Sequence, residues 1–278
     1  MSAPQRTAAR GASGHFRSGD LRLHYLEHGG GPLTLIIVPG ITSPAITWEF
    51  VAERLAGEHR VLTLDVRGRG LSETPEGGGY SLRDYAGDLA AMIEELGLER
   101  PALLGHSMGA RIVAALAVLR PELAGPLVIA DPPMSGPGRD PYPITRERFR
   151  EQVRQARDDG LTVDEVRRQY PRWDEEACRL RAEWLETCDE TAVAESHRSF
   201  EEEDVMPYLR RVRPPALFLY GLESPVVTAE AAREVAQANP RLEMAGVPGA
   251  AHMLPWENLE GFLEPTRRFL AQAAEQRR

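Results

Sequence analysis

Short apolar runs recur along the chain, separated by longer stretches of mixed polarity. They occupy residues 33–40, 60–65, 101–106, 126–131, 216–221 and 241–247. Continuous apolar runs of this length are typical of strands that are buried on both faces of a sheet. Residues 20–29 differ, because Leu21, Leu23 and Tyr25 alternate with polar neighbours. This alternation predicts a half-buried strand, and the turn-like composition of residues 17–20 predicts that it belongs to an N-terminal hairpin.

Segments with helical signals lie between these runs. Residues 81–97 begin with Ser81 as a candidate N-cap, carry Asp84 three positions later and end at Gly97. Residues 108–119, 228–239 and 257–274 are further helical segments. Strands that alternate with helices predict an α/β fold, in which helices flank both faces of a mostly parallel, twisted sheet.

One long segment breaks this alternation. Residues 132–213 contain no convincing strand and have charged helical stretches instead, with Thr145, Thr162, Asp174 and Asp189 as candidate N-caps. So long an insertion does not fit within the sheet layer. We therefore expect a helical cap, inserted after the strand that ends at Asp131, over the carboxyl ends of the strands, where ligands bind. The predicted organisation is a flexible N-terminal tail (residues 1–14), a core (residues 15–131 and 214–278) and a cap (residues 132–213).

Charge and composition narrow the classes of function. The chain has 278 residues and a net charge of −9, which disfavours binding to nucleic acid. It contains no Lys, which excludes Schiff-base lysine chemistry and a P-loop. No apolar run approaches the roughly 20 residues of a membrane span, and the N-terminal segment lacks the apolar stretch of a secretion signal. We expect a cytoplasmic protein without nucleic-acid or membrane partners, either a monomer or a small homo-oligomer.

The segment from Gly105 to Gly109 carries the clearest chemical signal. It places Ser107 between two glycines, at the junction of a predicted strand and a predicted helix. A tight strand-to-helix turn needs small residues two positions before and after the serine, and such a turn presents the hydroxyl at the top of the sheet. The helix N-terminus also favours developing negative charge. Ser107 is therefore the candidate nucleophile.

A serine nucleophile needs a base, and the base needs a carboxylate. His252 follows the last predicted strand and is the candidate base, whereas we expect His106, beside the serine, to be structural. Asp131, at the end of the strand after the nucleophile helix, is the preferred acid. Glu223, in the loop after the next strand, is the alternative.

An oxyanion hole requires two main-chain amides that point at the tetrahedral oxygen. Met108 follows the nucleophile directly, and Ile41 lies in the loop after the apolar run at residues 33–40. Their positions make these two amides the candidate donors. This chemistry needs no metal and no organic cofactor.

Several longer segments together resemble a known family. They are VPGITSPAITWEFVAERL, LDVRGRGLS, LLGHSMGAR, DPPMSGPGRDPYP and LRAEWLETC. Over residues 15–273 the chain resembles the α/β-hydrolase superfamily, and these segments resemble the N-formylmaleamate deformylases of bacterial nicotinate and related pyridine-ring degradation. Matched residue by residue, the triad of that family corresponds to Ser107, Asp131 and His252. Residues 220–230 do not match closely, which leaves Glu223 as the alternative acid.

The resemblance implies hydrolysis of the formyl C–N bond of N-formylmaleamate, which yields maleamate and formate through a formyl-enzyme. Such a substrate is small and carries a carboxylate. Because the chain has no Lys, an Arg must meet this carboxylate if any cation does, and Arg111 and Arg181 are the candidates. Trp48 and Trp184, together with Trp256, are candidates for an apolar wall of the substrate pocket.

Two other functions stay open at this stage. A carboxylesterase, or a carbon–carbon-bond hydrolase acting on an aromatic ring-cleavage product, would use the same triad with a different cap pocket. A non-catalytic receptor would retain Ser107 and His252 only to hold a small ligand. A haloalkane dehalogenase is disfavoured, because it needs a carboxylate nucleophile where Ser107 stands.

Overall fold

An eight-stranded sheet lies at the centre of the computed structural model, which describes residues 6–275. Its strands are β1 (Ala12–Ser18), β2 (Leu21–His28), β3 (Leu33–Val38), β4 (His59–Leu64), β5 (Ala102–His106), β6 (Leu127–Ala130), β7 (Ala216–Gly221) and β8 (Leu242–Val247). The spatial order is β1-β2-β4-β3-β5-β6-β7-β8. The β1–β2 and β2–β4 pairs are antiparallel, and the other neighbours are parallel. Both the predicted hairpin and the mostly parallel sheet are confirmed.

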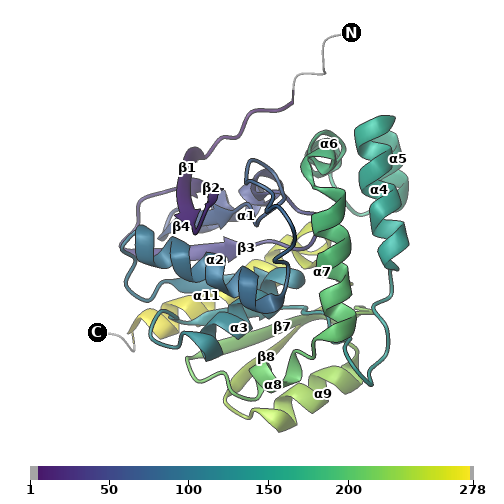
Figure 1. Cartoon of the computed structure of the whole chain (residues 1–278). Helices are drawn as coiled ribbons and strands as arrows, with labels where there is room; N and C mark the ends of the chain where they lie inside the picture. The colour runs from purple at the N-terminus through teal and green to yellow at the C-terminus, as the bar shows by residue number, and fades with distance from the viewer. Residues whose placement is uncertain (1–5, 276–278) are drawn as a thin grey trace.

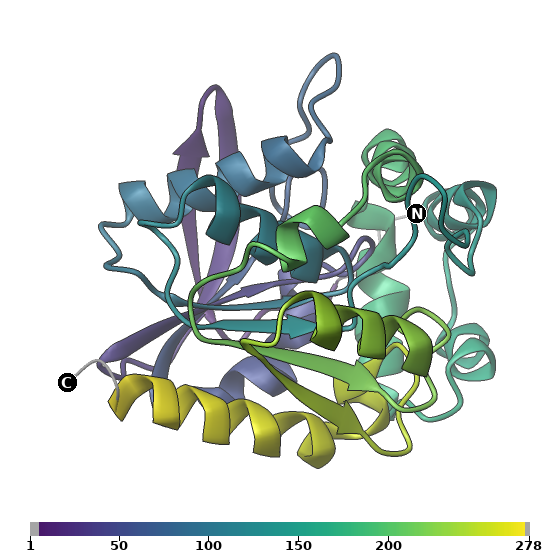
Figure 2. The ribbon, with the colours of Figure 1, turned by 90° about the horizontal axis from the view of Figure 1, so that it is seen from below.

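Helices cover both faces of this sheet, which explains the continuous apolar runs. In β3, Ile36 and Val38 pack in one core cluster, whereas Leu35 and Ile37 pack in another on the opposite face. The first cluster includes α2 (Leu82–Glu95), α3 (Met108–Leu119) and α9 (Ala229–Ala238). The second includes α1 (Glu49–Leu55) and α11 (Leu259–Glu275). Figure 2 shows α11, in yellow, on the side of the sheet opposite to α2, in blue. The α/β fold class is thus confirmed.

Helix starts follow the capping signals of the sequence. Ser81 and Asp84 form a reciprocal capping box at the start of α2, and Thr228 caps α9. The sequence pattern did not predict α1, which has only seven residues and no side-chain cap. Two further short helices, η1 (Ala45–Trp48) and α10 (Leu254–Glu257), were also not predicted. A helix of one or two turns is too short to show a clear helical period in the sequence. Such a helix also has little stability of its own and depends on tertiary packing.

The insertion between β6 and β7 is helical throughout its regular parts. It contains α4 (Arg146–Asp158), α5 (Val163–Gln169), α6 (Glu175–Trp184), η2 (Leu185–Thr187), α7 (Glu190–Glu202) and α8 (Met206–Leu209). Thr145, Thr162, Asp174 and Asp189 cap α4, α5, α6 and α7 with their side chains, as the sequence predicted. Figure 1 shows α4 to α7 gathered at one end of the sheet. Residues of these helices meet the loops that follow β3, β5 and β8, so the insertion covers the carboxyl ends of the strands.

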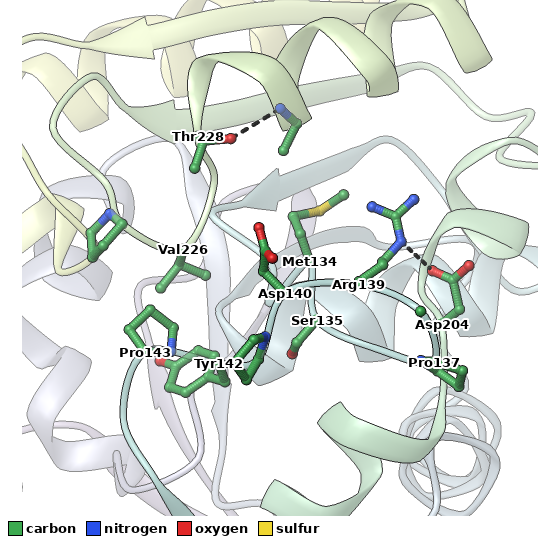
Figure 3. Close-up of a pocket in the computed structure, with 14 residues that line it drawn as sticks. Met134, Ser135, Pro137, Arg139, Asp140, Tyr142, Pro143, Asp204, Val226 and Thr228 are labelled. Carbon is green, nitrogen blue, oxygen red and sulfur yellow. Dashed lines mark hydrogen bonds and ion pairs between the residues drawn. The ribbon is translucent and has the colours of Figure 1, made fainter.

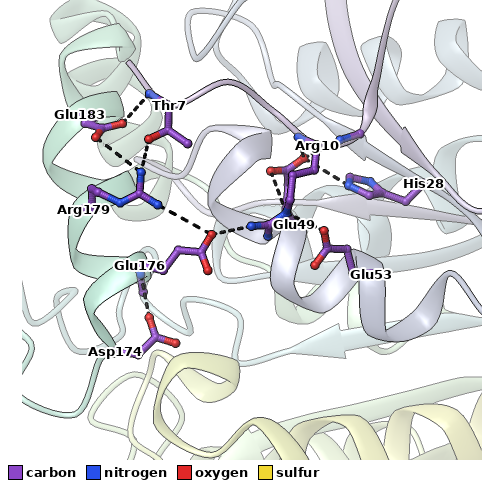
Figure 4. Close-up of polar contacts among 11 residues, drawn as sticks. Thr7, Arg10, His28, Glu49, Glu53, Asp174, Glu176, Arg179 and Glu183 are labelled. Atoms are coloured by element: carbon purple, nitrogen blue, oxygen red, sulfur yellow. Dashed lines mark hydrogen bonds and ion pairs between the residues drawn. The ribbon is translucent and has the colours of Figure 1, made fainter. Parts of the chain in front are cut away.

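The N-terminal segment connects this insertion to the core (Figure 4). The amides of Arg10 and Gly11 both donate to Oε1 of Glu49 on α1, each at 2.8 Å. The Arg10 guanidinium pairs with Glu53 on α1 and with Glu176 on α6. The expected flexible tail over residues 1–14 is therefore wrong from residue 6 onward, because these contacts tie the segment down and β1 begins at Ala12. Residues 1–5 lie outside the described part of the chain.

Candidate active site

Ser107 occupies a strained turn between β5 and α3. Its backbone has φ +55° and ψ −120°, a conformation that non-glycine residues rarely adopt. The flanking glycines allow this turn to form: a Cβ on Gly105 would lie 2.2 Å from the carbonyl oxygen of Gly109. A Cβ on Gly109 would lie 1.8 Å from the carbonyl oxygen of Val38. The two glycines that defined the motif are thus required by close backbone packing.

The structure brings Ser107, His252 and Asp131 together in one hydrogen-bonded chain. Oγ of Ser107 lies 3.0 Å from Nε2 of His252, and Nδ1 of His252 lies 2.7 Å from Oδ2 of Asp131. The Asp131 side chain is fully buried. A buried carboxylate must be satisfied by hydrogen bonds, and here the amide of Gly221 and the hydroxyl of Ser224 also donate to it. This arrangement can hold the imidazole with its proton on Nδ1 and a free lone pair toward Ser107.

Glu223, the alternative acid, lies on the surface. Its carboxylate pairs with Arg172 at 2.8 Å, and 51% of its side chain is exposed. Arg172 also donates to the carbonyl oxygen of Gly249, in the loop that carries His252. The Glu223 amide donates to the carbonyl oxygen of Ala250 in that loop, but its carboxylate pairs with Arg172, and Asp131 occupies the position beside Nδ1.

His106 and Cys188 are both buried, and burial favours the neutral form of each. Burial, together with the proximity of His252, lowers the pKa of His106 to about 3. Because a carbonyl only accepts, Nε2 of His106 must donate to the carbonyl oxygen of His252, at 2.8 Å. This bond fixes the backbone of the His252 loop, as expected for a structural histidine. Burial likewise raises the pKa of Cys188 to about 11, so its thiol is a poor nucleophile.

The loop after β3 brings Ile41 to the cleft that Ser107 also lines, and its main-chain amide is the candidate donor. Within residues 6–275, neither this amide nor that of Met108 donates a hydrogen bond to the protein. The loop is nevertheless fixed. Arg69 donates to the carbonyl oxygen of Ile41 at 2.9 Å, and Arg181 donates to that of Thr42 at 2.5 Å. Two amides left unpaired in a rigid loop and at a helix N-terminus are suited to bind an oxyanion.

A cleft of about 280 Å³ opens above Ser107 and His252. Aromatic side chains from the insertion form much of its wall, namely Tyr142, Phe149, Tyr170 and Trp173. The Tyr142 hydroxyl reaches Nε2 of His252 at 3.2 Å. Sequence reasoning missed all four of these aromatic residues. The Pro-Tyr-Pro run around Tyr142 was part of a motif that supported the family resemblance, but no local signal indicated which side chains of the insertion face the core.

The structure separates the predicted substrate-binding residues. Arg181 lines the cleft. Arg111 does not: it is fully buried beside Phe200, donates to the carbonyl oxygen of Glu203, and has its pKa lowered to about 10 by burial. Its prediction as a substrate ligand is wrong, because its position on α3 directs it under the end of α7 rather than into the cleft.

The tryptophan predictions are wrong for a similar reason. Trp48 is fully buried under the sheet, 5.0 Å from the ring of Trp256, and Trp184 packs against Leu26 and Ile46. Trp256 lies behind the cleft wall and stacks on Trp173 at 5.3 Å. Trp256 supports the wall through Trp173, but neither it nor Trp48 nor Trp184 lines the cleft.

No group of three or more His, Cys, Asp or Glu side chains among residues 6–275 is arranged to hold a metal ion. In the same part of the chain, no helix combines the length and apolarity needed to cross a membrane.

Comparisons with known proteins agree with this geometry. Residues 35–264 match the Alpha/beta hydrolase family. The chain is 42% identical over 259 residues to N-formylmaleamate deformylase from Pseudomonas putida, covering 93% of this chain and 96% of that protein. It is 32% identical to 2-(acetamidomethylene)succinate hydrolase from Mesorhizobium japonicum, with coverages of 88% and 92%. A solved structure of an N-formylmaleamic acid deformylase from Pseudomonas putida has a TM-score of 0.85 and 39% identity, over 91% of this chain and 99% of that one. The resemblance seen in the sequence is confirmed, and the chain belongs to the α/β-hydrolase family.

Proposed function

We propose that this protein is a serine hydrolase that cleaves the formyl C–N bond of N-formylmaleamate to give maleamate and formate. The observation that carries the proposal is the chain of hydrogen bonds from Ser107 through His252 to the buried Asp131, at 3.0 and 2.7 Å. Ser107 and His252 line a small aromatic cleft, which Arg181 also lines. The similarity to N-formylmaleamate deformylase over nearly the whole chain supports this choice of substrate.

Acylation begins at the serine. Nε2 of His252 takes the Ser107 proton as Oγ bonds to the formyl carbon, and the amides of Ile41 and Met108 stabilise the resulting oxyanion. The C–N electron pair then passes to the nitrogen, which receives the proton from Nε2. The Asp131 carboxylate, which accepts a hydrogen bond from Nδ1, stabilises the imidazolium of His252 during this step. The leaving nitrogen is acidified by its own carbonyl group, so its expulsion is easier than from a simple amide.

Deacylation repeats the sequence with water. His252 removes a proton from a water molecule, which attacks the formyl ester on Ser107. Collapse of the second tetrahedral intermediate releases formate and returns the proton to Oγ.

Arg181 is the proposed ligand of the substrate carboxylate. It is buried, yet no carboxylate within residues 6–275 pairs with it. Nη1 donates to the carbonyl oxygen and hydroxyl of Thr42, and its other nitrogens have no partner in this part of the chain. A buried cation without a counterion favours an anionic ligand, and a guanidinium matches a carboxylate in geometry.

The decisive experiment measures formate and maleamate release from N-formylmaleamate, with p-nitrophenyl acetate and a ring-cleavage dienoate as comparison substrates. We expect rapid release of formate from the first substrate. Ser107→Ala should reduce it by about 10⁴-fold or more, whereas Ser199→Ala, which removes a hydroxyl on α7, should not. Faster turnover of the ester or of the dienoate would favour the corresponding alternative function.

A fluorophosphonate probe separates an enzyme from a receptor. We expect covalent labelling of Ser107 that is lost in His252→Ala. A serine that stays unlabelled in the folded wild-type protein would contradict the hydrolase proposal.

Arg181→Met tests carboxylate recognition. The loss of a charge-assisted hydrogen bond, about 1.5–3 kcal/mol, should weaken binding of N-formylmaleamate by roughly 10- to 100-fold. N-formylacrylamide lacks the carboxylate, so its turnover controls for any disturbance of the Thr42 loop. An equal loss with both substrates would contradict this role of Arg181.

A further inference from the structure

Tyr142 meets the catalytic base from the side of the insertion. Its hydroxyl lies 3.2 Å from Nε2 of His252, the nitrogen that must give a proton to the leaving group, and it also faces the Ser107 hydroxyl. The proposed oxyanion amides come instead from the loop after β3 and from the start of α3. Besides the triad and the two oxyanion amides, the site therefore has a further polar group, the Tyr142 hydroxyl, near the reacting atoms. The triad mechanism assigns no role to it.

Packing holds this hydroxyl in place. The Tyr142 ring lies 5.4 Å from the ring of Phe200, 5.8 Å from that of His197 and 6.1 Å from that of Phe149. Prolines on both sides restrict the backbone. The ring also separates the catalytic cleft from a second cavity of about 550 Å³, and Pro225 lines both. Figure 3 shows Tyr142 and Pro143 on one wall of this second cavity, with the Arg139–Asp204 ion pair on the other.

The phenol is a donor rather than a base. Burial raises the pKa of Tyr142 well above its ordinary value, and the nearby charge of Asp131 raises it further. The hydroxyl therefore keeps its proton at neutral pH. It has one hydrogen to donate, and in the free enzyme the acceptors within its reach are Nε2 of His252 and Oγ of Ser107.

The proposed reaction develops charge at a second oxygen. When the formyl C–N bond breaks, the electron pair moves to a nitrogen that is conjugated with the carbonyl group of the leaving amide. Part of the negative charge therefore appears on that carbonyl oxygen, about 2.2 Å from the nitrogen by standard bond lengths. The oxyanion amides are already bound to the formyl oxygen, so this second oxygen needs a donor on the side of Nε2.

We propose that the Tyr142 hydroxyl donates a hydrogen bond to the carbonyl oxygen of the leaving amide, and so selects substrates whose leaving nitrogen carries an acyl group. This inference rests on the proposed function. The bond from Oγ of Ser107 to the formyl carbon forms and the C–N bond breaks. The proton on Nε2 moves to the nitrogen, while Tyr142 keeps its own proton throughout. Tyr142 is thus a catalytic and specificity-determining residue.

Tyr142→Phe is the appropriate variant, because it keeps the ring and the wall between the two cavities. The assay compares N-formylmaleamate with p-nitrophenyl formate, whose phenolate leaving group has no acyl carbonyl and needs no proton. We expect kcat for N-formylmaleamate to fall by about 10²-fold, as for removal of an oxyanion donor. The rate with p-nitrophenyl formate should change by less than about threefold. Tyr208→Phe, which removes a tyrosine hydroxyl on α8 outside the cleft, should leave both rates nearly unchanged.

The ratio of the two rates does not depend on the concentration of folded enzyme, so a partly unfolded variant still reports the effect. If Tyr142→Phe does not fold, Tyr142→Leu provides the same ratio. Equal losses with both substrates, or no loss with either, would overturn the inference.

A different result would contradict the proposed function, namely a wild-type protein that does not release formate from N-formylmaleamate. In that case N-formylacetamide replaces it as the acyl-bearing substrate in the same comparison. A Tyr142→Phe effect that is equal on N-formylacetamide and on the ester would again contradict the role of Tyr142.

Discussion

The hydroxyl of Ser224 lies 2.6 Å from Oδ2 of Asp131, the same oxygen that accepts the hydrogen bond from Nδ1 of His252. The amides of Val226 and Val227 donate in turn to Oγ of Ser224 and orient its hydroxyl. The loop after β7, where Glu223 was the alternative acid, thus contributes a serine that positions the carboxylate at the end of β6.

Ser224→Ala should lower kcat by roughly 10-fold, because a hydrogen bond to a charged group contributes about 1.5–3 kcal/mol and part of this loss falls on the orientation of His252. KM should stay nearly constant, since Ser224 does not line the cleft. Steady-state kinetics measure both constants, with Ser199→Ala as the matched control. An increase in KM at constant kcat would show that Ser224 does not act through the acid.

Asp131→Asn should reduce kcat by about 10⁴-fold, since an amide in this position favours the wrong imidazole tautomer. Glu223→Gln should change kcat less than twofold, because it removes only an exposed ion pair with Arg172. The two variants are assayed side by side with the same substrate. The reverse pattern would assign the acid to Glu223.

Arg69→Met should lower both kcat and stability. The fully buried guanidinium donates to the carbonyl oxygen of Ile41 at 2.9 Å and to the hydroxyl of Ser196 on α7 at 2.9 Å. Its loss leaves buried carbonyl groups without donors, at a cost of about 3 kcal/mol in the free energy of unfolding. It also frees the loop that presents the Ile41 amide, so kcat should fall by about 10-fold.

Ser196→Ala is the control for Arg69, because it removes one partner on α7 and leaves the bond to Ile41 intact. We expect a smaller loss of stability and an almost unchanged kcat. Kinetics and urea unfolding of both variants distinguish these outcomes. Equal kcat in the two variants would contradict a role of Arg69 in orienting the oxyanion loop.

Glu49→Gln should remove a pH-dependent part of the stability. Burial by itself raises the pKa of Glu49, but hydrogen bonds from His28 and from the amides of Gly11 and Arg10 lower it below its ordinary value. A folded-state pKa below the unfolded one stabilises the fold above the unfolded pKa of about 4.3. This stabilisation is lost as the pH falls through the lower, folded-state value.

Urea unfolding should therefore show the variant to be about 2 kcal/mol less stable than wild type at pH 7. The difference should shrink progressively below about pH 4. Glu53→Gln is the control, since Glu53 pairs with the same Arg10 side chain but is exposed and should contribute little. A difference that grows toward acidic pH would contradict this account of Glu49.

Much of the fold was predictable because its signals are local. Continuous apolar runs located the strands, and side chains such as Ser81 and Thr145 located the helix starts by capping them. The sequence pattern did not predict helix α1, because a seven-residue helix without a side-chain cap depends on tertiary packing. The N-terminal segment was expected to be a tail, since the partners that tie it down lie on α1 and α6.

The sequence by itself determined the architecture and the residues that it brings together as the candidate triad, Ser107, Asp131 and His252. They follow the carboxyl ends of strands, and parallel strands end at the same edge of a sheet. Only the tertiary structure decided which residues face the substrate. It directs Arg111, Trp48 and Trp184 into the interior and directs Arg181, Tyr142 and Trp173 into the cleft. The physical reason is that the orientation of a side chain depends on how its helix or loop packs against the rest of the fold, and local sequence periodicity does not contain that information.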